Sequence, residues 1–474
     1  MNTILRIMIL CLSIGVFIVG VLFSNPYTML FAVLIMLLHN LWYSLEDFYK
    51  RVVFLIFNGT FFIFLVGRMV VNVFFNYKES TSGLFGLNFN EVEIINHTLI
   101  ALYISLFFLF IGFVLIQKFG KKVISKENTS EGKELFWKSF KIFSKYFFYF
   151  TVIFRIIYLY EARSVANVEG YFETFSTFQS QMPGILVLLS GMYDVAFFAF
   201  LATKPSKKES ILPIGLYLVE GIFSLLSGRR SGFMLNILIL FIYFCLRNIK
   251  NREDLFSKTR TWLKKGGWIG KKEIIGAILI LPILMIISNT VGYLRAGADS
   301  VEISFVESVF EFLFSQGVSA NVIGYTLVLT ESIPDKMYSI GPIIEFIDNK
   351  IIGHYIMGEP EFMGQTVDRA LNGYLFAHTI SYLVMPNLYL MGVGYGSSYI
   401  AELYNDFGYL GVAIGSVIYG VLIGKFTTWF QAKNILLVLI TLMMLRSFLF
   451  TPRSFSFAIV FSQFLSSFEI SPKK

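Results

Sequence analysis

Apolar residues lie in long blocks along this chain, and short polar stretches separate the blocks. Each block holds roughly 17–23 residues, which is the length that a helix needs to cross a hydrocarbon core about 30 Å thick. No alternating pattern of about ten residues is present, so a membrane β-barrel is excluded and the blocks must be helices. The pattern predicts an all-α integral membrane protein with about twelve transmembrane helices, over residues 5–23, 27–43, 53–75, 97–117, 142–160, 184–202, 211–227, 231–247, 274–292, 408–424, 434–450 and 454–469.

The composition agrees with this fold class. Hydrophobic residues make up 56% of the 474 positions and charged residues only 15%, whereas soluble domains have about 45–50% and about 25%. Cys11 and Cys245 both lie in predicted spans and provide neither a disulfide framework nor metal-ligand spacing. The first block continues into Ser24-Asn25-Pro26 without a small-residue cleavage site, so we expect it to be a retained helix.

The basic residues set the orientation. Lysine-rich connections follow the second, fourth, sixth, eighth and tenth spans, and two lysines end the chain. All of these fall on the same side of the membrane, and the intervening connections are poor in lysine. Because basic loops stay in the cytoplasm, both termini are predicted to be cytoplasmic in a multi-pass protein of the inner membrane.

Arginine and lysine are distributed differently across the two sides. The cytoplasmic side holds 21 Lys and 5 Arg, whereas the outer loops and outer halves of the spans hold 9 Arg and 3 Lys. An ammonium group is sufficient to fix orientation, but a guanidinium group can bind phosphate or carboxylate through two parallel hydrogen bonds. The contrast indicates an outward-facing anion site; the alternative is that these arginines pair with acids at helix ends.

A long outer loop, about residues 293–407, lies between the ninth and tenth spans of what we predict to be a single polytopic domain over residues 1–474. The loop holds 13 acidic and four basic residues, a formal charge of −9, which excludes a nucleic-acid partner. Residues 301–315 have the pattern of an amphipathic helix, which either lies in the membrane interface or packs within the protein. A loop of this length is usually functional.

Charged residues inside predicted spans include Arg68, Arg155, Asp194 and Glu220. Charges in the hydrocarbon core are costly and normally face a cavity or one another. One interpretation is therefore a buried structural pair, such as Glu220 with Arg68 or Arg155. The other is that the arginines face a ligand.

The tight outer turn at residues 227–232 (SGRRSG) contains two adjacent arginines, Arg229 and Arg230, against the positive-inside trend. The flanking glycines allow close approach of a ligand, and the dipole of the following helix favours an anion. His378 in the outer loop is a candidate general base, although it precedes an apolar stretch as a packed residue also would.

The segment 392–411 (GVGYGSSYIAELYNDFGYLG) resembles a segment of Wzy-type O-antigen polysaccharide polymerases, in which Ser-Ser-x-x-Ala-Glu-x-Tyr-x-Asp-Phe-Gly leads into a late span. The turn at 227–233 is similar to the Gly-Arg-Arg segment of that family. The span layout and the long outer loop agree, so the resemblance covers most of the chain. At Ser397-Ser398 this chain departs from the related ligases, which have a His-Asn pair there.

The resemblance implies a glycosyltransferase that transfers glycan from undecaprenyl diphosphate to an incoming lipid-linked repeat unit on the outer face of the membrane. It also implies a GT-C-like fold, similar to that of O-antigen ligases and SEDS glycosyltransferases, with no cofactor, metal or nucleotide sugar. Besides the undecaprenyl-diphosphate-linked oligosaccharide and membrane lipid, a chain-length-regulating membrane protein is an implied partner.

This chemistry needs fixed cations for the diphosphate leaving group and a base for the acceptor hydroxyl. The candidate diphosphate-binding residues are Arg68, Arg155, Arg229, Arg230, Arg295 and Arg369. The candidate catalytic residues are Arg229, Arg230, His378, Glu402 and Asp406.

Three other functions compete with the polymerase, namely an O-antigen ligase, a flippase or transporter of lipid-linked oligosaccharide, and a non-catalytic membrane scaffold or sensor. A flippase usually shows two related halves, and the long outer loop breaks any such symmetry. The sequence does not distinguish O-antigen from capsule or exopolysaccharide, and it does not specify the sugars, the linkage, the general base or the oligomeric state.

Overall fold

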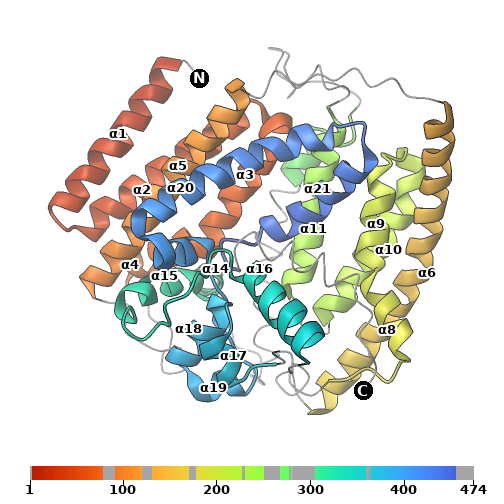
Figure 1. Cartoon of the computed structure of the whole chain (residues 1–474). Helices are drawn as coiled ribbons and strands as arrows, with labels where there is room; N and C mark the ends of the chain where they lie inside the picture. Colours follow the sequence, from red (N-terminus) through yellow and green to blue (C-terminus); the bar gives the residue numbers. More distant parts are fainter. Residues whose placement is uncertain are drawn as a thin grey trace. The chain divides into compact units, whose positions relative to one another are not determined.

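The computed structural model describes residues 3–77, 91–119, 131–169, 178–226, 230–249, 267–276, 279, 305–358, 362 and 364–454. The chain divides into two compact units. Unit 1 comprises residues 1–116, 302–424 and 448–463, and unit 2 comprises residues 117–301, 425–447 and 464–474. Within the described ranges every regular element is a helix and no strand is present, as the apolar blocks predict (Figure 1).

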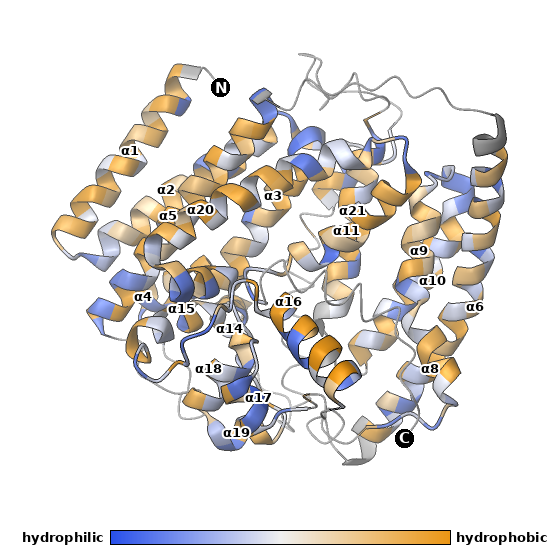
Figure 2. Cartoon of the chain, in the orientation of Figure 1, coloured by the Kyte–Doolittle hydropathy of each residue, from blue (hydrophilic) through white to orange (hydrophobic). Residues whose placement is uncertain are grey.

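Unit 1 contains the long N-terminal helices and the late helix that carries the signature segment. Its long elements are α1 (Thr3–Leu22), α2 (Pro26–Leu45), α3 (Phe48–Phe61), the π-helix η1 (Phe62–Val66), α4 (Gly67–Phe75), α5 (Val92–Phe119) and most of α20 (Tyr399–Phe430). The consecutive elements α3, η1 and α4 together form one apolar span from Phe48 to Phe75. Figure 2 shows these helices largely in the colour of hydrophobic residues.

Close backbone contact joins α5 to α20. A Cβ atom at Gly112 would lie 2.1 Å from the Val417 carbonyl oxygen, and one at Gly420 would lie 2.2 Å from the Leu109 carbonyl oxygen. Nearer the start of both helices, the Ser105 and Ser416 hydroxyls are 2.9 Å apart. The two helices therefore run in the same direction, with small residues at the crossing, as is common where membrane helices associate.

Short helices of the outer loop gather at one end of unit 1 (Figure 1). They are α14 (Phe305–Gln316), α15 (Ser319–Val328), α16 (Gly341–Glu345), the π-helix η4 (Phe346–Met357), α17 (Val367–Asn372), α18 (Phe376–Val384) and α19 (Pro386–Leu390). The helix expected over residues 301–315 corresponds to α14. It packs against α4 and η1 and buries Phe312, Leu313 and Phe314, while Phe305 and Val306 at its start are exposed.

Unit 2 is a bundle whose α6, α9 and α10 lie side by side (Figure 1). Its elements are α6 (Glu131–Glu169), α8 (Gly184–Gly191), α9 (Tyr193–Ala202), α10 (Lys207–Leu226), α11 (Arg230–Arg247) and α21 (Ile435–Phe448). A short break at Met192 separates α8 from α9, which together form one candidate span.

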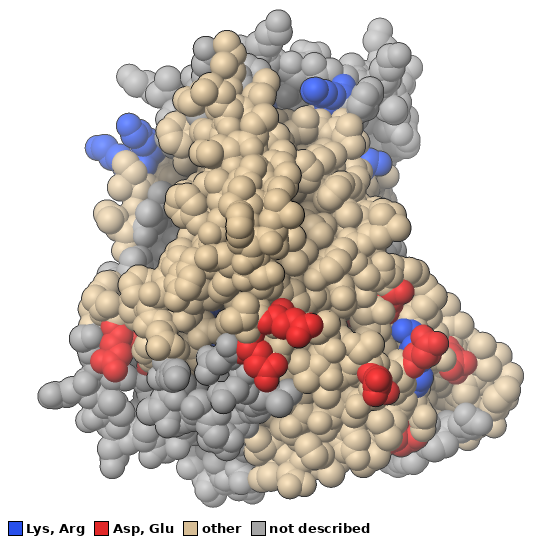
Figure 3. Space-filling view, turned by 90° about the vertical axis from the view of Figure 1, so that its left-hand side faces the viewer, with Lys and Arg blue, Asp and Glu red and all other residues tan. Residues whose placement is uncertain are grey.

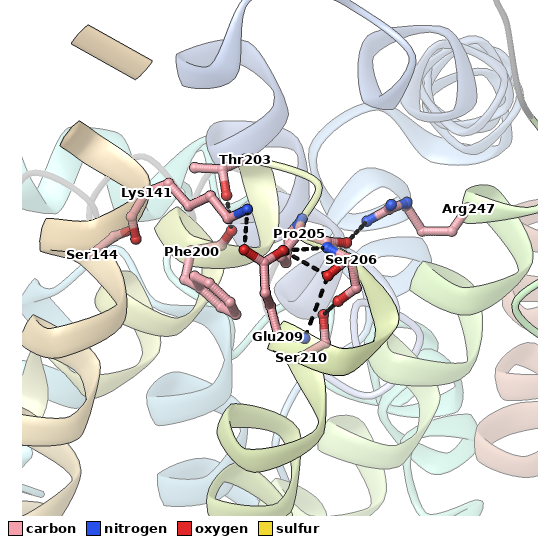
Figure 4. Close-up of polar contacts among 9 residues, drawn as sticks. All are labelled: Lys141, Ser144, Phe200, Thr203, Pro205, Ser206, Glu209, Ser210 and Arg247. Carbon is pink, nitrogen blue, oxygen red and sulfur yellow. Dashed lines mark hydrogen bonds and ion pairs between the residues drawn. The ribbon is translucent and has the colours of Figure 1, made fainter. Parts of the chain in front are cut away.

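At one end of unit 2, the connection between α9 and α10 is tied to two other helices (Figure 4). Glu209 accepts hydrogen bonds from the backbone and hydroxyl of Ser206, at 2.8 and 2.7 Å, and pairs with Lys141 of α6 at 2.5 Å. Arg247 at the end of α11 donates to the Pro205 carbonyl oxygen at 2.9 Å. All of these residues were assigned to the cytoplasmic side, and the structure places them together at one end of the unit.

In unit 1, residues that are predicted to be cytoplasmic also contact one another. Arg6 of α1 and Arg51 of α3 both contact the Glu46 carboxylate between α2 and α3, at 3.3 and 3.9 Å. On the face shown in Figure 3, most basic side chains lie near one end and the acidic side chains lie toward the other, where some basic side chains accompany them, with a largely uncharged region in between. This separation is what a helix bundle that crosses a membrane requires.

Eight helices in the described part of the chain are long and apolar enough to cross a membrane, and two shorter apolar helices, over 232–247 and 435–448, correspond to two further expected spans. The expected spans over 274–292 and 454–469 lie almost entirely outside the described residues. The structure thus supports an integral membrane protein, while the number twelve and the GT-C-like arrangement stay predictions.

Candidate functional site

The signature segment forms a loop followed by the first turns of α20. Glu402 is fully buried, and its carboxylate accepts a 2.6 Å hydrogen bond from the Ser397 hydroxyl. Six residues later, Gly408 adopts φ +62° and ψ −157°, a backbone conformation that is essentially restricted to glycine, and the helix kinks there. The glycine of the Asp-Phe-Gly sequence is therefore required by the backbone, whereas Glu402 lies in the first turn of the helix.

Arg68 is the second residue of α4, directly after the π-helix η1, and π-helical turns are frequent at functional sites. Its Nη1 donates to the Phe314 carbonyl oxygen near the end of α14 at 2.6 Å, and its guanidinium lies 3.7 Å from the centre of the Phe314 ring. Gly317 permits this approach, because a Cβ atom there would lie 2.4 Å from the Arg68 Cβ. A cation at the carboxyl end of a helix also interacts favourably with the helix dipole.

Arg453 reaches the same end of α14 from the segment that follows α21. Its Nη1 donates to the side-chain oxygen of Gln316, and its guanidinium lies 5.6 Å from the centre of the Phe64 ring in η1. The Arg453 carbonyl oxygen would lie 3.0 Å from a Cβ atom at Gly396, just before α20. Sequence reasoning counted Arg453 among the outer arginines but did not assign it to the site.

Two tyrosines extend the cluster. The Tyr325 hydroxyl of α15 donates to the Tyr395 hydroxyl at 3.2 Å, and the two rings pack at 5.5 Å between centres. Burial raises the pKa of both phenols, while the positive charge of Arg68 acts in the opposite direction. Both hydroxyls therefore keep their protons at neutral pH. Neither tyrosine was predicted as a site residue, because the sequence gives no signal that joins positions 70 residues apart.

Asp406 holds the outer loop. Its two carboxylate oxygens accept hydrogen bonds from the backbone N–H groups of Tyr338 and Ser339, at 3.1 and 2.8 Å. A carboxylate whose oxygens are both used in this way fixes the loop to α20. Its predicted catalytic role stays a prediction.

Arg369, another predicted site residue, pairs with a carboxylate of the same loop. Its Nη2 lies 3.2 Å from Glu345, and its Nη1 donates to the Gly364 carbonyl oxygen at 3.1 Å. The second oxygen of Glu345 accepts from the Tyr374 backbone N–H at 2.9 Å. This network connects α16 to α17 and neutralises the Arg369 charge.

His378 packs inside the loop. Its Nδ1 is 2.9 Å from the Tyr389 hydroxyl, which also donates to the Thr366 carbonyl oxygen at 3.3 Å. Burial, with a contribution from the nearby Arg369 charge, lowers the pKa of His378 to about 3. At neutral pH the imidazole is therefore neutral but weakly basic, whereas an effective general base has a pKa near the operating pH.

Unit 2 contains the other intramembrane arginine that the sequence singled out. Arg155 Nε lies 3.0 Å from the Glu220 carboxylate, which is only 1% exposed. Asn236 donates to the second Glu220 oxygen at 3.2 Å and accepts from the Tyr217 hydroxyl at 2.9 Å. The pairing of Glu220 with Arg155, one of the two that the sequence left open, is the one formed.

Asp194, the remaining intramembrane acid, also has a basic partner in unit 2. It forms an ion pair with Arg446 of α21. Tyr193 lies between this pair and the Arg155 network, with its ring 4.9 Å from the Arg155 guanidinium. The charged residues inside unit 2 thus neutralise one another.

Three candidate arginines are not placed by the structure. Arg229 and Arg295 lie outside the described residues, and for Arg230 only the backbone, at the first position of α11, is described. In unit 1 the structure brings Arg68 together with Arg453 and the two tyrosines near the start of α20, whereas Arg369, His378 and Asp406 belong to the hydrogen-bond network of the loop.

The fold and this cluster define an integral membrane protein with long apolar helices, a folded loop and arginines near the start of the late helix α20. A sequence model of the family "O-antigen polysaccharide polymerase Wzy" matches residues 5–471, nearly the whole chain. The chain therefore belongs to the Wzy family of O-antigen polysaccharide polymerases. Membership makes it a glycosyltransferase-type polymerase of polysaccharide biosynthesis that acts on lipid-linked repeat units in a membrane. No curated protein and no solved structure matches the chain.

Proposed function

We propose that this protein transfers a growing glycan from undecaprenyl diphosphate to an incoming lipid-linked repeat unit, on the outer face of the inner membrane and with both termini in the cytoplasm. The observation that carries the proposal is the convergence of Arg68 with Tyr325 and Tyr395 beside the loop that leads to Glu402. This end of unit 1 carries the folded acidic loop.

In the proposed reaction the bond between the glycan anomeric carbon and the diphosphate oxygen breaks, and a new bond forms to a hydroxyl oxygen of the acceptor sugar. The electron pair of the broken bond stays on the diphosphate, whose developing charge Arg68 stabilises. The acceptor hydroxyl loses its proton to a base. No metal or nucleotide sugar takes part, because the donor already has a good leaving group.

Among the three predicted bases, Glu402 is the one we assign to this role. Asp406 uses both oxygens to hold the loop, and His378 is packed inside the loop against the Tyr389 hydroxyl. Glu402 is bonded to Ser397, so the acceptor proton can pass through the Ser397 hydroxyl to the carboxylate. Arg229, Arg230 and Arg295 remain proposed diphosphate ligands from the outer turn and loop, and a chain-length-regulating membrane protein remains a proposed partner.

The test uses the purified full chain in lipid with a synthetic undecaprenyl-diphosphate-linked repeat unit. A ladder of polymer supports the proposal, whereas a single transfer to a different acceptor indicates a ligase and a change of sidedness without bond formation indicates a flippase. Glu402→Gln should abolish the ladder, while Asp406→Asn should reduce the amount of folded protein more than the rate per folded molecule. A full rate for Glu402→Gln would exclude it as the base.

A further inference from the structure

Three basic side chains gather at the end of unit 2 that we predict to be cytoplasmic. Lys204 lies between α9 and α10, Lys207 begins α10, and Arg247 ends α11. The rings of Trp268 and Phe430 lie against them, and we call these five residues the basic–aromatic cluster. We propose that the basic–aromatic cluster binds the phosphate headgroup of an anionic phospholipid. This inference does not depend on the proposed glycosyl transfer.

The three cations of the cluster contact neutral groups. Lys204 Nζ donates to the Ala432 carbonyl oxygen at 3.5 Å, and Lys207 Nζ donates to the Gly267 carbonyl oxygen at 3.0 Å. Arg247 Nη1 donates to a carbonyl oxygen of the connection between α9 and α10, at 2.9 Å (Figure 4). Within the described ranges none of the three forms an ion pair, so their positive charges stay available to an anion.

The carboxylates at this end of unit 2 have other partners. Glu209 pairs with Lys141 at 2.5 Å and accepts from the turn that precedes α10. Glu273 accepts from the Gly270 backbone N–H at 2.9 Å and interacts with the charge of Lys207 only at longer range. The protein thus holds three cations together without placing a carboxylate among them, which is the arrangement that an anion-binding site requires.

Repulsion between two of the cations favours the same interpretation. The Lys204 and Arg247 side chains are both half-buried. Burial lowers the pKa of Lys204 to about 8, and the positive charge of Arg247 also lowers it. Lys204 is therefore mostly protonated at pH 7 and is repelled by Arg247. A phosphate near both would offset this repulsion, and it would accept charge-assisted hydrogen bonds, which are roughly twice as strong as those to neutral oxygens.

The aromatic rings hold the cations in place. The Arg247 guanidinium lies 4.3 Å from the centre of the Trp268 ring, and Lys207 Nζ lies 5.9 Å from the same centre. Lys204 Nζ lies 5.3 Å from the centre of the Phe430 ring. The face of an aromatic ring attracts a cation without neutralising its charge, and tryptophan is enriched at membrane–water interfaces.

The position of the cluster along the helices favours a lipid over other anions. One candidate span ends at Ala202, the next begins at Lys207, and the long span of α20 ends at Phe430. The cluster therefore lies where apolar helices leave the hydrocarbon core, which is the level of lipid phosphate groups. Basic groups between helix ends on the cytoplasmic side bind anionic headgroups in other membrane proteins.

The experiment titrates the purified full chain, in a neutral detergent, with short-chain phosphatidylglycerol and with phosphatidylcholine of the same acyl chains. Native mass spectrometry counts the bound lipid. The wild-type chain should bind phosphatidylglycerol several-fold more tightly. Lys204→Gln and Lys207→Gln should each weaken phosphatidylglycerol binding by about fivefold, the effect of one basic residue near a headgroup, and should leave phosphatidylcholine binding unchanged.

The matched control is Lys208→Gln, which removes the same charge from the exposed neighbour of Lys207 and should weaken binding by less than about twofold. Because the Lys207 side chain is itself exposed, Lys207→Gln should keep the melting temperature of the wild type. Equal losses in Lys207→Gln and Lys208→Gln would indicate diffuse attraction and overturn the site, as would equal affinity for the two lipids.

Two competitors test the source of the phosphate. Free glycerol phosphate and poly-glutamate should both fail to displace phosphatidylglycerol from the wild-type chain. Displacement by glycerol phosphate at a similar concentration would assign the cluster to a soluble phosphate ester, and displacement by poly-glutamate would assign it to an acidic protein segment. Either result would overturn the lipid assignment, and none of these measurements depends on polymer formation.

Discussion

In unit 2, the arginines inside the membrane contact carboxylates: Arg155 pairs with Glu220, and Arg446 pairs with Asp194. In unit 1, the acceptors described for Arg68 and Arg453 are neutral, a carbonyl oxygen and an amide oxygen at the end of α14. The contacts described for these arginines thus differ between the two units. An arginine paired with a carboxylate neutralises a buried acid, whereas Arg68 is the arginine that we propose to act on the diphosphate.

The largest expected effect tests whether the role of Arg155 in unit 2 is structural. Arg155→Met would leave the Glu220 carboxylate buried without its cation, which costs about 3–5 kcal/mol in comparable pairs. Little folded protein should then accumulate in membranes. Arg155→Met combined with Glu220→Gln removes both charges and should restore most of the protein and its polymer. A double variant with a normal protein level but no polymer would show that the Arg155 charge itself is functional.

The next effect tests whether Arg68 of unit 1 acts in the polymerisation reaction. Arg68→Gln should lower the polymerisation rate by about 10–100-fold, because hydrogen bonds to charged groups contribute about 1.5–3 kcal/mol. Its protein level and melting temperature should change little, since Gln can still donate to the α14 carbonyl group. The initial rate of ladder formation per folded molecule measures this. A rate loss that merely follows a loss of folded protein would place Arg68 with the structural arginines of unit 2.

A smaller effect compares one glycine from each unit. Gly408→Ala should destabilise the kinked start of α20 by about 1–3 kcal/mol, because alanine is strained at φ +62°. Gly215→Ala in α10 is the matched control: no atom lies within 4 Å of the added methyl group, so the helix should gain roughly 0.5–1 kcal/mol. Thermal unfolding of both variants checks the opposite signs, and equal shifts would contradict the role of the kink.

The smallest effect concerns pH. All four histidines, His39, His97, His354 and His378, belong to unit 1. The pKa of His378 is lowered from 6.5 to about 3, so its contribution to stability is complete above about pH 6.5 and is lost as the pH falls toward 3. At pH 5 the loss should be about 1–2 kcal/mol, and His378→Gln should remove this part of the pH dependence. Identical melting curves of the two proteins at pH 7 and pH 5 would argue against this linkage.

Much of the fold could be predicted from the sequence because membrane helices satisfy their own backbone and need only a long apolar block. The blocks around 27–43 and 97–117 correspond to α2 and α5, and even the short blocks at 231–247 and 434–450 are helices. The break between α8 and α9 at Met192 was missed, because the apolar block continues across it, although the turn-forming dipeptide Ser190-Gly191 directly precedes it. The outer loop was predicted only in part, since its short helices depend on tertiary contacts such as Asp406 with Ser339.

The candidate site was harder to predict than the fold. Periodicity and charge placed Arg68 on the outer side, but nothing in the sequence links it to Phe314, 246 residues away, or Arg453 to Gln316, 137 residues away. His378, Asp406 and Arg369 had suitable residue types, and only their packing shows that they hold the loop together. The sequence could therefore nominate residue types, while the choice among them needed three-dimensional contacts.

The contacts of Thr451 and Arg453 also have a consequence for biosynthesis. The ribosome makes the chain from the N-terminus, so Arg68 enters the membrane long before Gln316 is translocated, and Arg453 is translated later still. The start of α20 and the end of α14 can be fastened by these residues only after nearly all helices have been inserted. A nascent or truncated chain that ends before Thr451 therefore lacks the contacts that fasten this segment to α20 and α14.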